Sequence, residues 1–145
     1  MTRRLVCEVG GHLFAIDIAQ VREAVERPGA AAPLPGAPPW VLGLVNVRGL
    51  VLPVVDLGGW LGLGRAGDGP DPVCLLLEAG GRRLGALVSR LEGIEDGGAE
   101  DAADGISEGM LEALGVRRFR AVGARPDGRP LWHLDVSTLF ADVYP

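Results

Sequence analysis

The sequence predicts an all-β fold of two small β-barrels with a few short helical turns. Of the 145 residues, 48% are hydrophobic, and they gather in short runs of the length of a buried strand. The 23 glycines and 11 prolines lie between these runs, where turns between strands are expected. A similar order of strands occurs in both halves of the chain, which predicts two units of like plan.

The N-terminal part of the chain begins with a predicted hairpin. Residues 5–9 and 12–18 form two apolar segments around a Gly-Gly pair at 10–11, which is typical of a hairpin turn. Residues 19–26 fit both a helical stripe and the alternation of a strand, so the sequence leaves this element open. Residues 30–39 hold four prolines, which predicts an extended connector.

The central hairpin is the most distinctive stretch of the chain. Residues 42–47 and 50–55 are aliphatic strands that flank Arg48 and Gly49. We expect Gly49 to take the positive φ of the turn, which arginine adopts only at a cost. Arg48 is then either a solvated turn residue or a guanidinium that is held at the hairpin tip for binding.

The second half continues with more strands and short helices. Strands are predicted at residues 73–77, 83–88, 91–94, 119–124 and 131–136, and helical turns at 57–63, 110–114 and 137–140. Ser137 is the predicted cap of the last helix. The acidic, Gly-rich residues 95–108 predict a solvated, mobile loop. The predicted core includes Ile16, Val45, Val54, Leu76, Leu87 and Leu134.

The two halves echo each other. A strand-Gly-Gly-strand hairpin at 10–11 returns at 80–81, and an apolar-Asp-apolar strand end at Asp56 returns at Asp135. Small barrels have little core of their own, so we expect them to pack on one another. The prediction is a single domain over 1–145 with two subdomains, divided near loop 62–72.

The sequence shows no catalytic constellation. Its serines and Thr138 lie in no nucleophile-elbow pattern, and His12 and His133 are expected to be structural. Asp17, Asp56 and Asp135 each follow a strand, where a carboxylate commonly caps a turn or helix. These features predict an interaction module that is not an enzyme.

Several ligand classes are also disfavoured. Cys7 and Cys74 follow no ligand spacing and are expected to be small buried hydrophobes, so no metal or cofactor is predicted. The net charge of -5 argues against nucleic-acid binding. No apolar run reaches the roughly 20 residues of a membrane span, and the N-terminus lacks a signal peptide. We therefore expect a cytoplasmic protein without direct membrane insertion.

Residues 41–57 resemble the CheW family, the adaptors of bacterial chemotaxis. The family pattern stands here as Val-Leu-Gly-Leu-Val-Asn-Val-Arg-Gly at 41–49 and Leu-Pro-Val-Val-Asp-Leu at 52–57. Weaker matches cover nearly the whole chain. The resemblance implies two five-stranded SH3-like β-barrels on a shared apolar core. It also implies a non-catalytic scaffold that couples chemoreceptor tips to the regulatory domain of the histidine kinase CheA, in receptor arrays at the membrane.

The resemblance also implies interaction residues. The residues expected to contact receptor and kinase are Val21, Glu23, Gly43, Asn46, Arg48 and Gly49. Those expected on the kinase side are Val73, Cys74 and Gly85. The chain departs from the family pattern at Ser89 and Ala24.

Two other functions remain open. The first is a related adaptor in a parallel motility pathway or another CheA-like pathway. The second is a small-ligand-binding or hydrolytic β-barrel, which would need a pocket lined by Asp17, His133 and Arg48.

Overall fold

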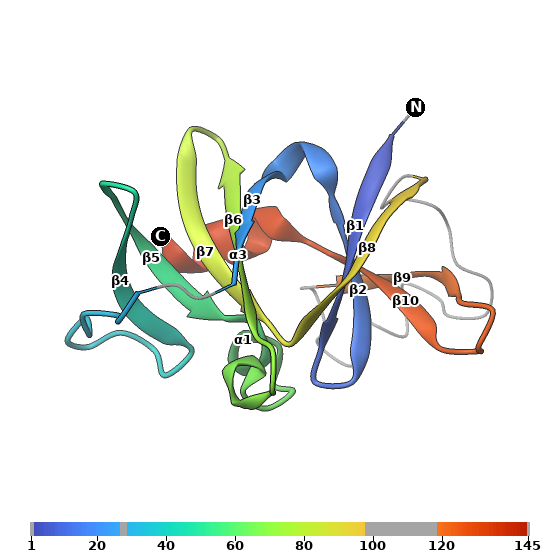
Figure 1. The fold of residues 1–145 in the computed structure, drawn as a ribbon, viewed down its shortest axis with the longest axis horizontal. Coiled ribbons are helices and arrows are strands. Elements are labelled where there is room, and N and C mark those ends of the chain that lie inside the picture. The colour runs from blue at the N-terminus through green and yellow to red at the C-terminus, as the bar shows by residue number, and fades with distance from the viewer. Residues whose placement is uncertain (1, 27–28, 98–118, 145) are drawn as a thin grey trace.

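Ten strands form two five-stranded sheets within the residues that the computed structural model describes, 2–26, 29–97 and 119–144 (Figure 1). Sheet A has the order β8 (Arg90–Asp96), β1 (Arg3–Val9), β2 (His12–Asp17), β10 (Pro130–Leu134) and β9 (Phe119–Ala124). Sheet B has the order β3 (Val21–Val25), β6 (Val73–Ala79), β7 (Arg82–Val88), β5 (Leu50–Asp56) and β4 (Val41–Val47). The predicted all-β class with five strands in each unit is confirmed.

Short helices begin at an aspartate that closes a strand. Asp17 begins η1 (Ile18–Gln20), Asp56 begins α1 (Leu57–Leu61), and Asp135 begins α3 (Val136–Val143). Each carboxylate accepts a backbone N–H of its helix, so the capping role is confirmed. Ser137 was the predicted cap of the last helix, but Asp135 holds that position, and Ser137 Oγ donates to its carboxylate. A further turn, η2 (Ala66–Asp68), lies between α1 and β6.

The sheets share one plan, but each takes strands from both halves of the chain. In sheet A the hairpin β1–β2 pairs in parallel with β10, and in sheet B the hairpin β6–β7 pairs in parallel with β5. β8 then adds to β1, and β3 adds to β6. Loop 62–72 separates the two repeats along the sequence, yet it joins β5 and β6 of the same sheet. The sheets therefore do not divide at that loop, because the chain crosses between them after β2 and after β7.

A shared apolar core lies between the two sheets. Phe14, Ile16 and Leu134 of sheet A meet Leu75 and Leu84 of sheet B, all fully buried. The other face of each sheet carries its own smaller cluster: Val6, Leu13, Ala15 and Leu131 in sheet A, and Val45, Leu52, Val54, Cys74 and Leu87 in sheet B. Apolar side chains on both faces explain why strands such as β2 are buried along most of their length.

The predicted core residues are buried with one exception. Leu76 is only partly buried, because it faces the surface cavity described below. In residues 2–26, 29–97 and 119–144, no helix has the length and apolar character needed to cross a membrane. The predicted helix at 110–114 and most of the predicted loop 95–108 lie outside the described residues.

Candidate functional site

The tip of the β4–β5 hairpin presents an arginine from a two-residue turn. Arg48 has φ +53° and Gly49 has φ +85°. Only Gly49 was expected to adopt a positive φ, but a tight hairpin turn that matches the twist of its strands needs it at both central residues. Among the described residues, Arg48 is the only non-glycine with this conformation. Asn46 Oδ1 accepts the Gly49 N–H at 2.8 Å and so fixes the turn.

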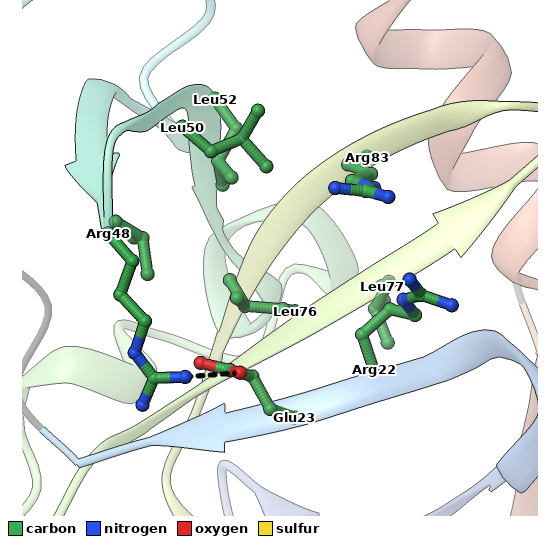
Figure 2. Close-up of a pocket in the computed structure, with 9 residues that line it drawn as sticks. Arg22, Glu23, Arg48, Leu50, Leu52, Leu76, Leu77 and Arg83 are labelled. Atoms are coloured by element: carbon green, nitrogen blue, oxygen red, sulfur yellow. Dashed lines mark hydrogen bonds and ion pairs between the residues drawn. The ribbon is translucent and has the colours of Figure 1, made fainter.

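The guanidinium of Arg48 reaches Glu23 on β3, the strand at the opposite edge of sheet B from β4. Arg48 NH1 donates to Glu23 Oε2 at 2.8 Å (Figure 2). The Arg48 side chain is 78% exposed, whereas that of Glu23 is 33% exposed. The second carboxylate oxygen, Glu23 Oε1, is buried and accepts no hydrogen bond within the described part of the chain. This carboxylate therefore has unused acceptor capacity beside an exposed cation.

The ion pair borders a cavity of about 250 Å³. Its lining consists of Arg22, Glu23, Val47, Arg48, Leu50, Leu52, Leu76, Leu77 and Arg83. Figure 2 shows leucines of β5 and β6 between Arg48 and Arg83. Neither Asp17 nor His133 lines this cavity, so the constellation required for a hydrolytic barrel does not form around Arg48. The cavity instead combines an apolar floor with charged groups that can hydrogen-bond a polypeptide.

A matching ion pair links the equivalent elements of sheet A. Arg125, in the turn between β9 and β10, donates through NH1 to both carboxylate oxygens of Glu95 on β8, at 2.6 and 2.9 Å. Arg4 adds a third hydrogen bond through Nε at 2.9 Å. The hydrogen bond from Arg125 is the largest cause that lowers the pKa of Glu95, and Arg4 adds to it, while burial opposes them. This pair is less exposed than Arg48–Glu23 and has an additional partner, so we interpret it as a structural brace.

Two predicted site residues have structural reasons for their identity. Val21 begins β3, is half-buried, and packs against the shared core. Gly43 has φ +135°, and a Cβ there would lie 2.2 Å from the carbonyl oxygen of Ala32. Ala32 forms two backbone hydrogen bonds with Leu44, so the connector before β4 lies directly on this strand. Gly43 thus allows the backbone of the connector to approach β4 closely.

The three predicted kinase-side residues are not equivalent. Val73 is half-buried and borders an acidic cavity of about 280 Å³ that also includes Glu26 and Asp71. Cys74 is fully buried, and burial raises the pKa of its thiol to about 11. A Cβ on Gly85 would lie 2.7 Å from the Cys74 sulfur, so these two residues pack β6 against β7. Cys74 is buried, as its place in an apolar strand predicted, and Gly85 is buried beside it, so neither presents a side chain at the surface.

The two departures from the family pattern lie on different parts of the fold. Ser89 joins β7 to β8, donates its N–H to the Glu8 carbonyl at 2.9 Å, and accepts the Gly10 N–H through Oγ at 3.3 Å. Ala24 is exposed on β3. Ser89 therefore connects the start of β8 to the first hairpin. The short side chain of Ala24 projects little from the surface beside Glu23.

Several cavity residues were missed by sequence reasoning. Arg83 Nε donates to Glu78 Oε2 at 2.9 Å, and Arg22 Nε forms an ion pair with the same oxygen at 3.1 Å, so the two arginines bring β3 and β7 together on β6. Leu50 and Val51 are exposed at the start of β5. The apolar residues directly after Arg48-Gly49 could have indicated this surface, because a strand start next to an exposed turn is solvent-accessible.

Residues 3–143 match the model of the CheW-like domain. The chain belongs to the CheW family. A CheW chemotaxis protein of Rhizobium meliloti (strain 1021) is 37% identical over 86 residues, 59% of this chain and 55% of that protein. Protein PilI of Pseudomonas aeruginosa is 43% identical over 54 residues, 37% of this chain and 30% of that protein. The chain thus matches about half the length of its CheW relative and less of PilI.

The CheW fold is also seen in a solved structure. The scaffolding protein TtCheW from Thermoanaerobacter tengcongensis superimposes with a TM-score of 0.72 at 20% identity, over 92% of this chain and 88% of that chain. This likeness supports the two-sheet architecture with its shared core.

Proposed function

We propose that this chain is a non-catalytic scaffold of chemotaxis-type signalling. In this role it couples the cytoplasmic tips of chemoreceptors to the regulatory domain of a CheA-type histidine kinase. Membership of the CheW family and the fold shared with a CheW scaffolding protein support the proposal. The protein would act in the cytoplasm and reach receptor arrays at the membrane through its partners.

The observation that carries this proposal is the Arg48–Glu23 pair at the rim of an apolar cavity. The turn fixes the backbone of Arg48, and Glu23 already orients its guanidinium, so little ordering remains to oppose binding. The exposed N–H groups of Arg48 can bind carboxylate or carbonyl oxygens of a partner in a bidentate manner. Glu23 Oε1 is buried beneath this pair, so the exposed guanidinium of Arg48 is the group that a partner can reach.

Val21, Glu23, Asn46, Arg48 and Gly49 would form or support this docking surface. Gly43, behind them, holds the connector against β4. On the kinase side, we assign direct contact to Val73, the partly exposed member of its group, while Cys74 and Gly85 shape the strands beneath.

The test is a pull-down from the native cell with the tagged chain as bait. Retention of both a chemoreceptor and a CheA-type kinase supports the coupling function. Purified receptor fragments and the kinase regulatory domain should then bind separately. If neither binds the parent protein, the proposed function is wrong.

A related adaptor role in a parallel pathway is the second candidate. The match to protein PilI is the observation that favours it. The same pull-down separates the candidates, because the identity of the retained kinase and receptor names the pathway.

A further inference from the structure

Strands β5 and β7 separate from each other beside the Arg48 cavity. Their parallel pairing covers only Val54 to Asp56 on β5 and Gly85 to Leu87 on β7. Pro53 directly precedes the first paired residue, and proline has no N–H with which to extend a ladder. Towards the hairpin tips the two strands therefore leave a gap that is lined by side chains.

This gap is a cavity of about 420 Å³. Its lining comprises Leu50, Val51, Leu52, Glu78, Gly81, Arg82, Arg83 and Tyr144. Leu50, Leu52 and Arg83 also line the first cavity, so the two cavities adjoin, and we refer to them together as the groove from Arg48 to Tyr144. Figure 2 shows this junction, with Leu50 and Leu52 on the β5 side and Arg83 on the β7 side.

The groove exposes apolar surface on its β5 side. Val51 is 59% exposed and Leu50 is 39% exposed, and they are two of the four large hydrophobic side chains that are exposed in the described parts of the chain. Solvent-exposed apolar groups that adjoin a groove with a charged rim are typical of an interaction site.

The rim carries an excess of positive charge in a protein of net charge -5. Four arginines, at 22, 48, 82 and 83, face two glutamates, at 23 and 78, which leaves two positive charges uncompensated. Arg82 is central to this excess, because it forms no ion pair with a carboxylate among the described residues. Its guanidinium carbon lies 4.9 Å from the centre of the Tyr144 ring, and NH1 donates to the Tyr144 carbonyl at 3.3 Å.

The Tyr144 contact orients Arg82 without neutralising its charge. The aromatic ring supports one face of the guanidinium, and Tyr144 is itself tied to β7, because its hydroxyl donates to the Arg83 carbonyl at 2.7 Å. An arginine held in this way keeps several N–H groups free for a planar anionic group such as a carboxylate.

We propose that this groove binds an acidic segment of a partner protein, with an apolar side chain against Leu50 and Val51 and a carboxylate on Arg82. The inference rests on the proposed function, because it extends the Arg48 docking surface and names the chemistry of the segment that the partner presents.

The experiment measures the affinity of the purified receptor fragment and of the kinase regulatory domain for a set of variants. Arg82→Glu should weaken the partner that occupies the groove by about tenfold or more, and the loss should shrink at high salt. Val51→Ser should weaken the same partner severalfold, without unfolding, because this side chain is mostly exposed. Arg129→Glu is the matched control, since Arg129 pairs with Asp127 inside its own turn on sheet A and undergoes the same change of charge.

The outcomes separate the two proposals. If Arg48→Ala weakens a partner and Arg82→Glu does not, the groove inference fails and the proposed function stands. If Arg82→Glu and Arg129→Glu weaken binding equally, net charge alone is responsible and the inference fails. The same variants are also tested for binding to vesicles of anionic phosphatidylglycerol. If Arg82→Glu and Val51→Ser bind these vesicles less well than the parent but bind both protein partners equally well, the groove contacts a membrane surface and the inference fails. The melting temperature of Arg82→Glu serves as a check that the Tyr144 contact with β7 is intact, and it should be close to that of the parent. If this melting temperature falls, the partner affinity of Val51→Ser decides whether the inference holds.

Discussion

Replacing Arg48 with alanine should weaken partner binding while leaving the protein folded. The ion pair with Glu23 is the intramolecular contact that the change removes, and the Arg48 side chain is 78% exposed. Exposed pairs of this kind contribute about 0.2–1 kcal/mol to stability. The backbone strain of the positive φ stays, because alanine meets the same steric conflict as arginine.

These magnitudes predict a small thermal effect and a large binding effect. For a domain of this size, 1 kcal/mol corresponds to roughly 2–4 °C in melting temperature, so Arg48→Ala should melt no more than about 4 °C below the parent. Loss of charge-assisted hydrogen bonds to a partner should cost about 1–3 kcal/mol of binding free energy. Arg48→Lys should recover only part of it, because an ammonium group cannot reproduce the planar fork.

The assay combines thermal melting with titration of the receptor fragment and the kinase regulatory domain. Arg129→Ala serves as the control, since it removes an exposed arginine from a local ion pair in the other sheet. A fall in melting temperature of 10 °C or more for Arg48→Ala, with affinity unchanged, would refute the reasoning and identify Arg48 as a brace. Parent-like melting together with parent-like affinity would reject both roles.

Three further predictions concern the scaffold. Gly43→Ala should destabilise the protein by about 3 kcal/mol or more, because its Cβ would meet the Ala32 carbonyl; a melting curve like that of the parent would contradict this. Val54→Asp should unfold it, since an unpaired carboxylate at a fully buried position costs several kcal/mol; circular dichroism reports the outcome. Glu95→Gln should flatten the acid dependence of melting. Because Arg125 lowers the folded-state pKa of Glu95, its stabilisation is complete above the unfolded-state pKa of about 4.3 and is lost as pH falls through the lower folded value. Identical acid profiles for parent and variant would exclude this linkage.

Local features of the fold were predictable from the sequence. Hairpins at the Gly-Gly pairs, aspartate caps and buried aliphatic strands each depend on neighbouring residues, so composition and spacing reveal them. Sheet membership was not predictable in the same way. The pairing of β1 with β8 joins segments that are far apart in the chain, and nothing in either strand alone specifies its partner.

The candidate site was predictable only in part. Arg48 and Glu23 followed from the family resemblance, but their hydrogen bond depends on how β3 lies relative to the β4–β5 tip. The role of Arg82 was hidden for the same reason, because Tyr144 reaches it from the far end of the chain. The burial of Cys74 was predictable from its apolar strand, whereas its close packing against Gly85 is visible only in three dimensions.

The exchange of strands between the two repeats means that neither half of the chain can complete a sheet by itself. Residues 3–61 supply the hairpin of sheet A and three strands of sheet B, and residues 73–143 supply the reverse. A break in loop 62–72 would therefore yield two complementary fragments, each with unpaired strand edges and an open apolar face that only the other can cover. For this chain, folding resembles the assembly of a heterodimer whose subunits are covalently joined. The first and last strands of the described chain, β1 and β10, both lie in sheet A, so a truncation that reaches either of them removes part of that sheet and with it one side of the shared core.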